Sequence, residues 1–145
     1  MKRSGEVFEV NVKGLLFCCQ AVAEGMIQRQ AGKIVNIASV AGFGGSDSWS
    51  AYCASKSAAI SLTLGLAEAL KEDNVQVHAI CPGATRTALL ERIQQAQPGS
   101  RFDWVHDPEE VAEEVIKLLV PFDQTATGRV VAMKPAGEVL GIRVR

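Results

Sequence analysis

The sequence predicts an α/β fold in which a parallel sheet is flanked by helices. Short apolar runs at residues 33–38, 75–80 and 128–133 are typical of buried strands. Longer stretches with helical periodicity separate these runs. Because helical connections of this length join parallel strands through right-handed crossovers, the alternation favours a parallel sheet over a hairpin fold.

Residues 6–30 are expected to form the first helix, because apolar and small side chains recur there at helical intervals. Gly32 is a plausible stop for it. Residues 51–72 predict a second, longer helix that is crowded with Ala, Ser and Gly, which allows close packing on the sheet. One side of this helix carries Ala59, Thr63, Leu66, Ala67 and Leu70.

The strand at 75–80 is closed by Cys81, Pro82 and Gly83. Proline cannot donate to the strand ladder, and glycine permits a turn close to a ligand. A helix through Leu90 and Ile93 is expected next, within a segment at 88–106 that we interpret as a substrate lid. Phe102 and Trp104 either line this lid or simply pack a loop. The run Asp107-Pro108-Glu109-Glu110 then predicts a helix start, with a cap, a proline and first-turn acids.

Three polar residues carry the functional signal. Tyr52 follows Ser39 by thirteen positions, and Lys56 follows Tyr52 by four. The second spacing is one helical turn, so the phenol and the ammonium share a face. A free tyrosine has a pKa of ~10, and a cation at ~4 Å favours the phenolate by ~4 kcal/mol at an effective dielectric of ~20. The set therefore suits proton transfer to or from an alcohol oxygen.

Together with Asn11 in NVKG and the turn CPGATRT, this set resembles the short-chain dehydrogenase/reductase family over residues 7–133. The resemblance implies a Rossmann-like fold and the interconversion of a secondary alcohol and a ketone with NAD or NADP. It implies Tyr52 as general acid/base, Lys56 as its tuner and a ribose ligand, Ser39 as substrate positioner, and Asn11 as anchor of a proton-relay water.

The same resemblance implies cofactor contacts at Tyr52, Lys56 and the turn after the second strand. The Pro82-Gly83 turn would lie under the nicotinamide, with Thr85 and Thr87 nearby. The alternative for Thr87 is an ordinary N-cap of the following helix. One departure is His78, where the family often has asparagine; a strand histidine more often satisfies a structural hydrogen bond, so we assign it no role.

The glycine-rich turn that holds a dinucleotide pyrophosphate does not occur in the 145 residues. Gly42, Gly44 and Gly45 lack its spacing and are read as a loop at the substrate mouth. We therefore expect residues 1–145 to be a single partial domain, the catalytic half, whose strand at 33–38 has a bare apolar edge. The chain is then a fragment, a truncated product or the result of a misplaced start, and the choice between NAD and NADP stays open.

The composition excludes several classes of function. The net charge is −1 and the basic residues form no stripe, so neither nucleic acid nor a membrane is an expected partner. The longest strongly apolar stretch, 15–19, is far too short to span a bilayer, and no signal peptide is seen. The cysteines lack metal spacing, so no metal site is expected; we read them as buried thiols in a reducing, cytoplasmic compartment. They are Cys18, Cys19, Cys53 and Cys81.

Two functional hypotheses follow. The first is an NAD(P)-dependent oxidoreductase acting on a 3-oxoacyl thioester, polyol, small diol or steroid-like small molecule, with the isolated fragment possessing little activity. The second is a non-catalytic truncated subunit that associates with a full-length relative. In the resembled family the helices matching 6–30 and 51–72 pack between subunits, so the resemblance implies a homo-oligomer, either a dimer or a tetramer.

Overall fold

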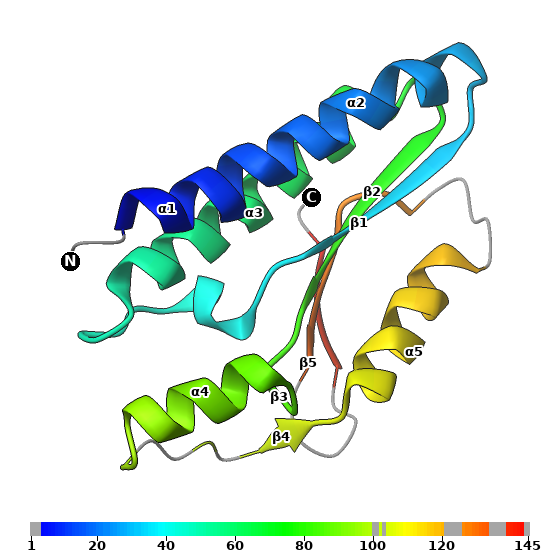
Figure 1. The fold of residues 1–145 in the computed structure, drawn as a ribbon. Helices are drawn as coiled ribbons and strands as arrows, with labels where there is room; N and C mark the ends of the chain where they lie inside the picture. The colour runs from blue at the N-terminus through cyan, green and yellow to red at the C-terminus, as the bar shows by residue number, and fades with distance from the viewer. Residues whose placement is uncertain (1–3, 100–101, 103, 121–125, 134–138, 144–145) are drawn as a thin grey trace.

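A four-stranded sheet, in the order β1-β2-β5-β6, forms the centre of the molecule (Figure 1). The computed structural model describes residues 4–99, 102, 104–120, 126–133 and 139–143. The elements of the sheet and its helices are α1 (Ser4–Phe8), η1 (Glu9–Gly14), α2 (Leu15–Gln28), β1 (Gly32–Ile37), η2 (Val40–Phe43), α3 (Ser50–Ala69), β2 (Val75–Cys81), α5 (Pro108–Leu119), β5 (Arg129–Met133) and β6 (Val139–Arg143).

The parallel core of the sheet confirms the predicted fold class. β1 pairs with β2 and β2 pairs with β5, both in parallel. β6 adds an antiparallel edge that the sequence did not indicate, because its residues carry no clear strand alternation. A second, two-stranded sheet joins β3 (Ala84–Thr85) to β4 (Val105–His106), and α4 (Ala88–Ala96) lies between them in the chain.

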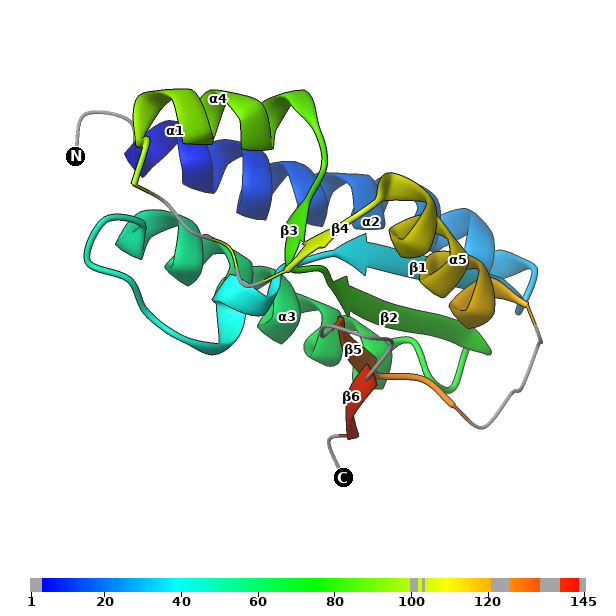
Figure 2. The same cartoon turned by 90° about the horizontal axis from the view of Figure 1, so that it is seen from below.

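Helices cover both faces of the sheet. α2 and α3 lie on one face and α5 on the other, as Figures 1 and 2 show from two directions. α3 packs closely because its buried positions are small: Ala59 is fully buried against Ala79 and Cys81 of β2. The predicted inner side of this helix is confirmed. Thr63, Ala67 and Leu70 are buried as Ala59 is, and Leu66 packs against the core cluster that contains Ala67 and Leu70.

A buried polar link ties three elements together. The Asn36 amide on β1 donates to Thr63 Oγ1 on α3 at 2.9 Å, and its oxygen lies 3.5 Å from the Cys19 sulfur on α2. Buried amides are costly unless they are hydrogen-bonded, so this link fixes how both helices sit on β1. Burial raises the pKa of the Cys19 thiol, with the Asn36 hydrogen bond acting in the opposite direction.

The first helix is continuous from α1 through η1 to α2, and it ends differently from the prediction. It stops at Gln28, and Gln30 adopts the left-handed conformation with φ 53°. Gly32 instead begins β1, where a Cβ would collide with the Met26 side chain. Gly32 therefore allows the helix and the strand to pack closely. It does not end the helix, which stops four residues earlier at Gln28.

The exposed side of this helix is apolar. Val10, Phe17 and Val22 are 71%, 58% and 44% exposed, and Cys18 is exposed too, so the expectation that all four cysteines are buried is wrong. Residues 5–28 also form a 24-residue helix with an 18-residue window of mean hydropathy 1.3, which is long and apolar enough to cross a membrane by length and composition alone. The uninterrupted apolar stretch at 15–19 is much shorter than the apolar helix that contains it. The absence of a membrane partner therefore remains a prediction.

Candidate functional site

Lys56 and Tyr52 lie on the same side of α3, as their spacing predicts. The Lys56 Nζ atom is 5.8 Å from the centroid of the Tyr52 ring and donates to the Ile37 carbonyl at 3.0 Å. Ile37 is the last residue of β1, so the ammonium spans from the helix to the carboxyl end of the sheet. Trp49 meets the Tyr52 ring edge-on at 6.3 Å between centroids.

Ser39 follows β1 directly and begins the short η2 turn. Its buried hydroxyl accepts from the Ala41 backbone N–H at 3.2 Å and donates to the Pro82 carbonyl at 3.4 Å. The η2 turn is pressed against α3 at Gly42, where a Cβ would be 2.9 Å from the Lys56 carbonyl carbon. Gly42 therefore lets the serine turn come within contact of the helix that carries Tyr52 and Lys56.

Cys81 ends β2 beside this turn, and the sequence did not single it out. Burial raises the pKa of its thiol to about 11, while a hydrogen bond from the Ser39 backbone and the Lys56 charge act in the opposite direction. Burial also lowers the pKa of the Lys56 ammonium, with a smaller opposing contribution from Cys81. Ser39, Lys56 and Cys81 therefore lie close together at the carboxyl end of the sheet, where Ser39 bonds to Pro82 and Lys56 to Ile37.

Asn11 on η1 contacts the same helix, α3. Its Nδ2 atom donates to Ser55 Oγ at 3.1 Å, and Ser55 Oγ donates to the Tyr52 carbonyl at 2.7 Å. Asn11 sits in the π-helical turn η1, a distortion that is frequent at functional sites. Ser55, which is fully buried between Tyr52 and Lys56, is the contact that sequence reasoning missed.

The turn after β2 carries the remaining predicted residues. The Pro82 carbonyl accepts from the Val40 N–H at 3.0 Å, which joins the ends of β1 and β2. Thr85 donates to the Gly83 carbonyl at 3.3 Å. Thr87 donates to the Thr85 carbonyl and caps α4 through the Leu90 N–H at 3.5 Å, so the N-cap alternative describes its present contacts.

Trp104 lies directly against Gly83. A Cβ on that glycine would be 2.6 Å from the indole Nε1, which is buried and has no hydrogen-bond partner within the described part of the chain. The parallel pairing of β3 with β4 holds this part of the 88–106 segment beside the turn; residues 100, 101 and 103 of the segment lie outside the described residues. Packing of Trp104 on a glycine is a tertiary contact that its sequence neighbours do not signal.

His78 behaves as the sequence interpretation expected. It is buried on β2 at 2% exposure, and its Nδ1 accepts from the Arg129 backbone N–H at 3.3 Å. Its ring is therefore a structural link between β2 and β5, away from Ser39 and Tyr52.

Comparison with known proteins agrees with this arrangement. A family sequence model described as short chain dehydrogenase matches residues 2–98. The chain is 34% identical over 143 residues to the inactive 2-(S)-hydroxypropyl-CoM dehydrogenase 2 of Xanthobacter autotrophicus, covering 89% of this chain and 61% of the relative.

Two solved structures with bound cofactor share the fold. ElxO with NADP bound matches with a TM-score of 0.74 at 25% identity, over 84% of this chain and 52% of that one. A 3-oxoacyl-[acyl-carrier protein] reductase from Brucella melitensis with bound NAD matches with a TM-score of 0.74 at 30% identity, over 90% and 50%. The chain thus spans about half the length of the structures it matches, and 47% to 61% of the curated relatives.

Proposed function

Since the chain belongs to the short-chain dehydrogenase family, we propose that it carries the proton-transfer half of an NAD(P)-dependent oxidoreductase that interconverts a secondary alcohol and a ketone. The observation that carries this proposal is the placement of Lys56, whose ammonium lies near the Tyr52 ring and bonds to the strand end next to Ser39. The substrate class, whether 3-oxoacyl thioester, polyol, small diol or steroid-like molecule, is part of the proposal.

Each side chain has a distinct role in the proposed reaction. Tyr52 moves a proton to or from the substrate oxygen, with the Lys56 ammonium 5.8 Å from the centroid of its ring. Ser39 releases its weak 3.4 Å bond to Pro82 and donates to the same substrate oxygen. Asn11 bonds through Ser55 to the turn of α3 that carries Tyr52 and Lys56. Its amide oxygen would hold the relay water.

The residues around the Pro82-Gly83 turn fit the nicotinamide end of a cofactor. Trp104 packs directly against Gly83, and its buried indole N–H, which has no partner within the described residues, is a donor that a carboxamide oxygen would satisfy. Tyr52, Lys56, Thr85 and Thr87 would complete the contacts. Bound nicotinamide, as NAD or NADP, supplies hydride chemistry. The pyrophosphate would need a glycine-rich turn that the 145 residues do not contain.

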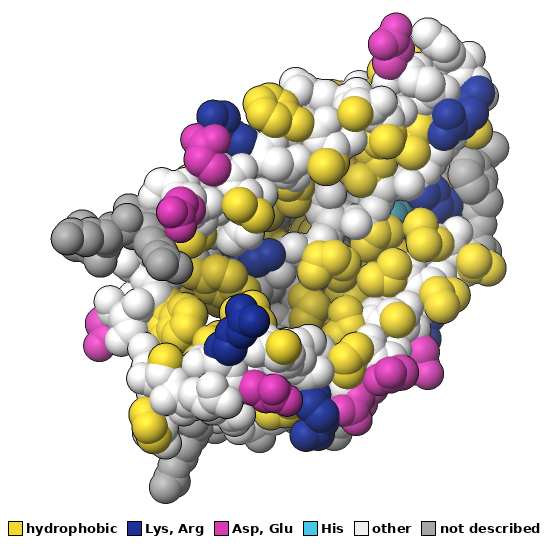
Figure 3. Space-filling view, in the orientation of Figure 1, with side chains coloured by type: hydrophobic (Ala, Val, Ile, Leu, Met, Phe, Trp, Pro, Cys, Tyr) yellow, Lys and Arg dark blue, Asp and Glu magenta, His cyan; other side chains and the backbone are white. Residues whose placement is uncertain are grey.

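A second candidate function is a truncated subunit that associates with a longer relative, and two exposed surfaces favour it. β1 stands at the edge of the described sheet, and Ile37 at its end is 48% exposed. Figure 3 shows hydrophobic side chains gathered on the face that carries this edge, between the long N-terminal helix and α5. An apolar strand edge of this kind readily pairs with another chain.

The outward apolar side of the helices also supports the proposed partners. Phe17 and Val22 on α2 lie exposed, as an interface between subunits would require. We propose that the helices at 6–30 and 51–72 form the homo-oligomer contact, in a dimer or a tetramer. The other proposed partner is a small molecule, and neither nucleic acid nor a membrane is proposed. The four free cysteines are consistent with a cytoplasmic location.

The test is a completed domain, made by joining the glycine-rich half of a 3-oxoacyl reductase relative to this chain. Nicotinamide oxidation is then followed with the candidate ketones. Tyr52→Phe is expected to reduce kcat by about 10²–10⁴-fold, because it removes the proton-transferring oxygen and keeps the ring. Ser48→Ala, an exposed change in the preceding loop, is the matched control.

Full turnover in the Tyr52→Phe protein would refute the assigned role. The subunit hypothesis is tested on the 145-residue chain by co-expression with a full-length relative. It predicts co-purification without an increase in NADH fluorescence, and a stable monomer that binds NADH would contradict it.

A further inference from the structure

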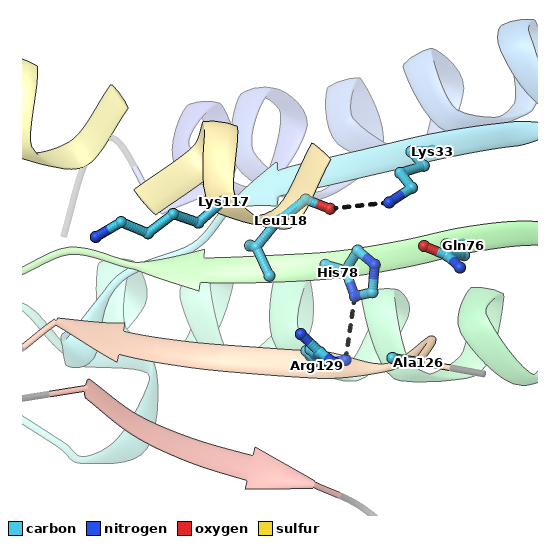
Figure 4. Close-up of a pocket in the computed structure, with 7 residues that line it drawn as sticks. All are labelled: Lys33, Gln76, His78, Lys117, Leu118, Ala126 and Arg129. Atoms are coloured by element: carbon cyan, nitrogen blue, oxygen red, sulfur yellow. Dashed lines mark hydrogen bonds between the residues drawn. The ribbon is translucent and has the colours of Figure 1, made fainter. Parts of the chain in front are cut away.

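A small cavity at the amino end of the sheet is lined by polar side chains that have partners. It has a volume of about 60 Å³ and lies between the starts of β1, β2 and β5 and the last turn of α5 (Figure 4). His78 accepts there from a backbone N–H of β5, and Lys33 donates to the Leu118 carbonyl. The buried side-chain atoms without a hydrogen-bond partner among the described residues lie elsewhere, at Trp104 and His106.

Trp104, just before β4, and His106, within it, lie on the same side of this segment. Side chains alternate along a strand, so residues two apart point to one face. β4 pairs in parallel with β3, with Thr85 opposite His106, and the His106 carbonyl accepts from the Arg86 N–H at 2.8 Å. One step back along this register brings Trp104 to Gly83, where the indole is found. The face therefore borders the turn after β2.

The two unpartnered atoms offer different hydrogen bonds. The indole Nε1 of Trp104 carries a hydrogen and is a donor only. His106 is 7% exposed, and its Nδ1 lies 3.5 Å from the Glu110 Oε2. A carboxylate beside one ring nitrogen favours the proton on that nitrogen, so the neutral imidazole presents Nε2 as an acceptor. A buried donor and a buried acceptor without partners are costly, which points to a missing ligand or water.

Glu110 is held in place by the start of α5 and not by the imidazole alone. Its Oε2 accepts from the Asp107 backbone N–H at 2.8 Å, as part of the capping box of this helix. Arg86, which follows β3, bonds to Asp107 Oδ1 at 2.7 Å. The carboxylate beside His106 is therefore positioned by the same contacts that join α5 to the small sheet.

We propose that Trp104 Nε1 and His106 Nε2 bind a neutral group that accepts one hydrogen bond and donates another, with Glu110 as the residue that orients the imidazole. Two residues along a strand span roughly 6.6 Å, close to the reach of two hydrogen bonds of about 2.9 Å through one small group. An anion would face the lone pair of Nε2, and a cation would face the indole N–H, so both fit less well.

Two sources supply such a group next to this turn. One is the carboxamide of the nicotinamide, and the other is a hydroxyl of the substrate. The indole donor already has a place in the proposed cofactor contacts, whereas the His106 acceptor and the carboxylate behind it do not. The inference rests on the proposed function for the source of the group, and on the two unpartnered atoms for its chemistry.

The group reaches the pair when the indole shifts on Gly83. Trp104 is half-buried and belongs to the 88–106 segment, and a Cβ on Gly83 would be 2.6 Å from its Nε1. Because Nε1 has no partner among the described residues, the shift breaks no hydrogen bond there.

The experiment follows the Trp104 indole N–H and the His106 ring nitrogens in nitrogen-edited NMR spectra of the 145-residue chain. The free protein is expected to carry the His106 proton on Nδ1. Titration with nicotinamide shifts the indole and Nε2 signals together if the natural group is the cofactor amide, and titration with glycerol does so if it is a substrate hydroxyl. Nicotinic acid, with a carboxylate in place of the amide, is the matched control ligand and is expected to shift neither.

Glu110→Gln is the decisive variant, because it keeps a capping side chain and removes the charge beside His106 Nδ1. It is expected to let the proton occupy either ring nitrogen and to weaken binding of the effective probe several-fold. Glu109→Gln, an exposed acid in the same helical turn, is the matched control and is expected to change neither. Trp104→Phe and His106→Phe each keep a ring and remove one hydrogen bond, so each is expected to weaken binding about tenfold.

Equal responses to nicotinamide and nicotinic acid, no response to nicotinamide or glycerol, or equal affinities in the Glu110 and Glu109 variants would overturn the proposal. A free His106 that carries its proton on Nε2 would contradict it equally. These spectra involve no turnover, so they fail independently of the Tyr52→Phe test. Full turnover in that variant would refute the proton-transfer role and leave the Trp104 and His106 site unaffected.

Discussion

The two ends of the parallel strands differ in how their polar groups are held. At the carboxyl end, Ser39, Lys56 and Pro82 are crowded by a glycine contact, and their polar atoms bond to nearby backbone. At the amino end, the buried His78 ring accepts from the Arg129 backbone N–H and lines a small cavity together with Gln76 and Leu118. The comparison teaches that close packing positions the residues of the proposed reaction at one end of the strands, whereas packing leaves a small cavity at the other end.

Gly42→Val tests the carboxyl end most severely. A Cβ at this position would be 2.8 Å from the Ile60 Cδ1 and 2.9 Å from the Lys56 carbonyl carbon, so the backbone of η2 or α3 must move. We expect a loss of about 1–3 kcal/mol in the free energy of unfolding, measured by urea denaturation.

Gly44→Ala is the matched control for this change, because nothing lies within 4 Å of its added Cβ and the backbone there is extended. If both variants unfold at the same urea concentration, the contact between the serine turn and α3 does not position the site.

The pH dependence of stability tests the amino end. His78 has a folded-state pKa of about 4 against an ordinary value of 6.5, so the unfolded chain binds more protons than the folded one between these limits. Stability is therefore unaffected above pH 6.5 and falls as the pH drops toward 4, by about 3 kcal/mol in total. Urea denaturation at a series of pH values measures this slope.

His78→Asn, which keeps an acceptor for the Arg129 N–H, is expected to flatten the curve between pH 5 and 6.5, where most carboxylates remain ionised. An unchanged slope in this variant would show that His78 is not buried as a neutral ring.

Asn11→Ala sharpens the comparison within the carboxyl end. The change removes one hydrogen bond to Ser55 Oγ, which keeps its bond to the Tyr52 carbonyl, so we expect a cost of about 1 kcal/mol. A double-mutant cycle with Ser55→Ala measures the coupling between the two, and a coupling of zero would contradict the link that joins η1 to the Tyr52 turn.

The smallest expected effect concerns the start of α5, which connects the two ends. Asp107 and Glu110 form a capping box, with the Asp107 N–H donating to Glu110 Oε2 at 2.8 Å. Asp107→Ala is expected to destabilise the protein by up to about 1 kcal/mol, while Asp107→Asn, which still caps, changes stability less. Thermal unfolding of the two variants distinguishes the lost cap from the lost charge.

Most of the core strands and part of the proposed site could be predicted from patterns of neighbouring residues. The apolar runs predicted β1, β2 and β5, and the order of the elements predicted their parallel pairing. Tyr52 and Lys56 share a face because a helix turns once in about four residues, which needs no tertiary information. The cap at Asp107 was equally local.

The errors and omissions arose where distant segments meet. The β3 to β4 pairing and the packing of Trp104 on Gly83 join residues about twenty positions apart in the chain, whereas β6 pairs with the strand just before it and was missed because its residues lack a clear alternation. Cys18 was expected to be buried because of its residue type, but its side chain is exposed on α2. Composition cannot distinguish an inner apolar side from an outward one.

The amino-acid sequence by itself determined the fold class and the order of the proton-transfer residues, because periodicity and short spacings act through the local backbone. Only the tertiary structure decided that Ser39 and Lys56 meet at Ile37 and Pro82, and that His78, Lys33 and Arg129 surround one cavity. These residues come together because parallel strands align their ends in space, whatever distance separates them along the chain.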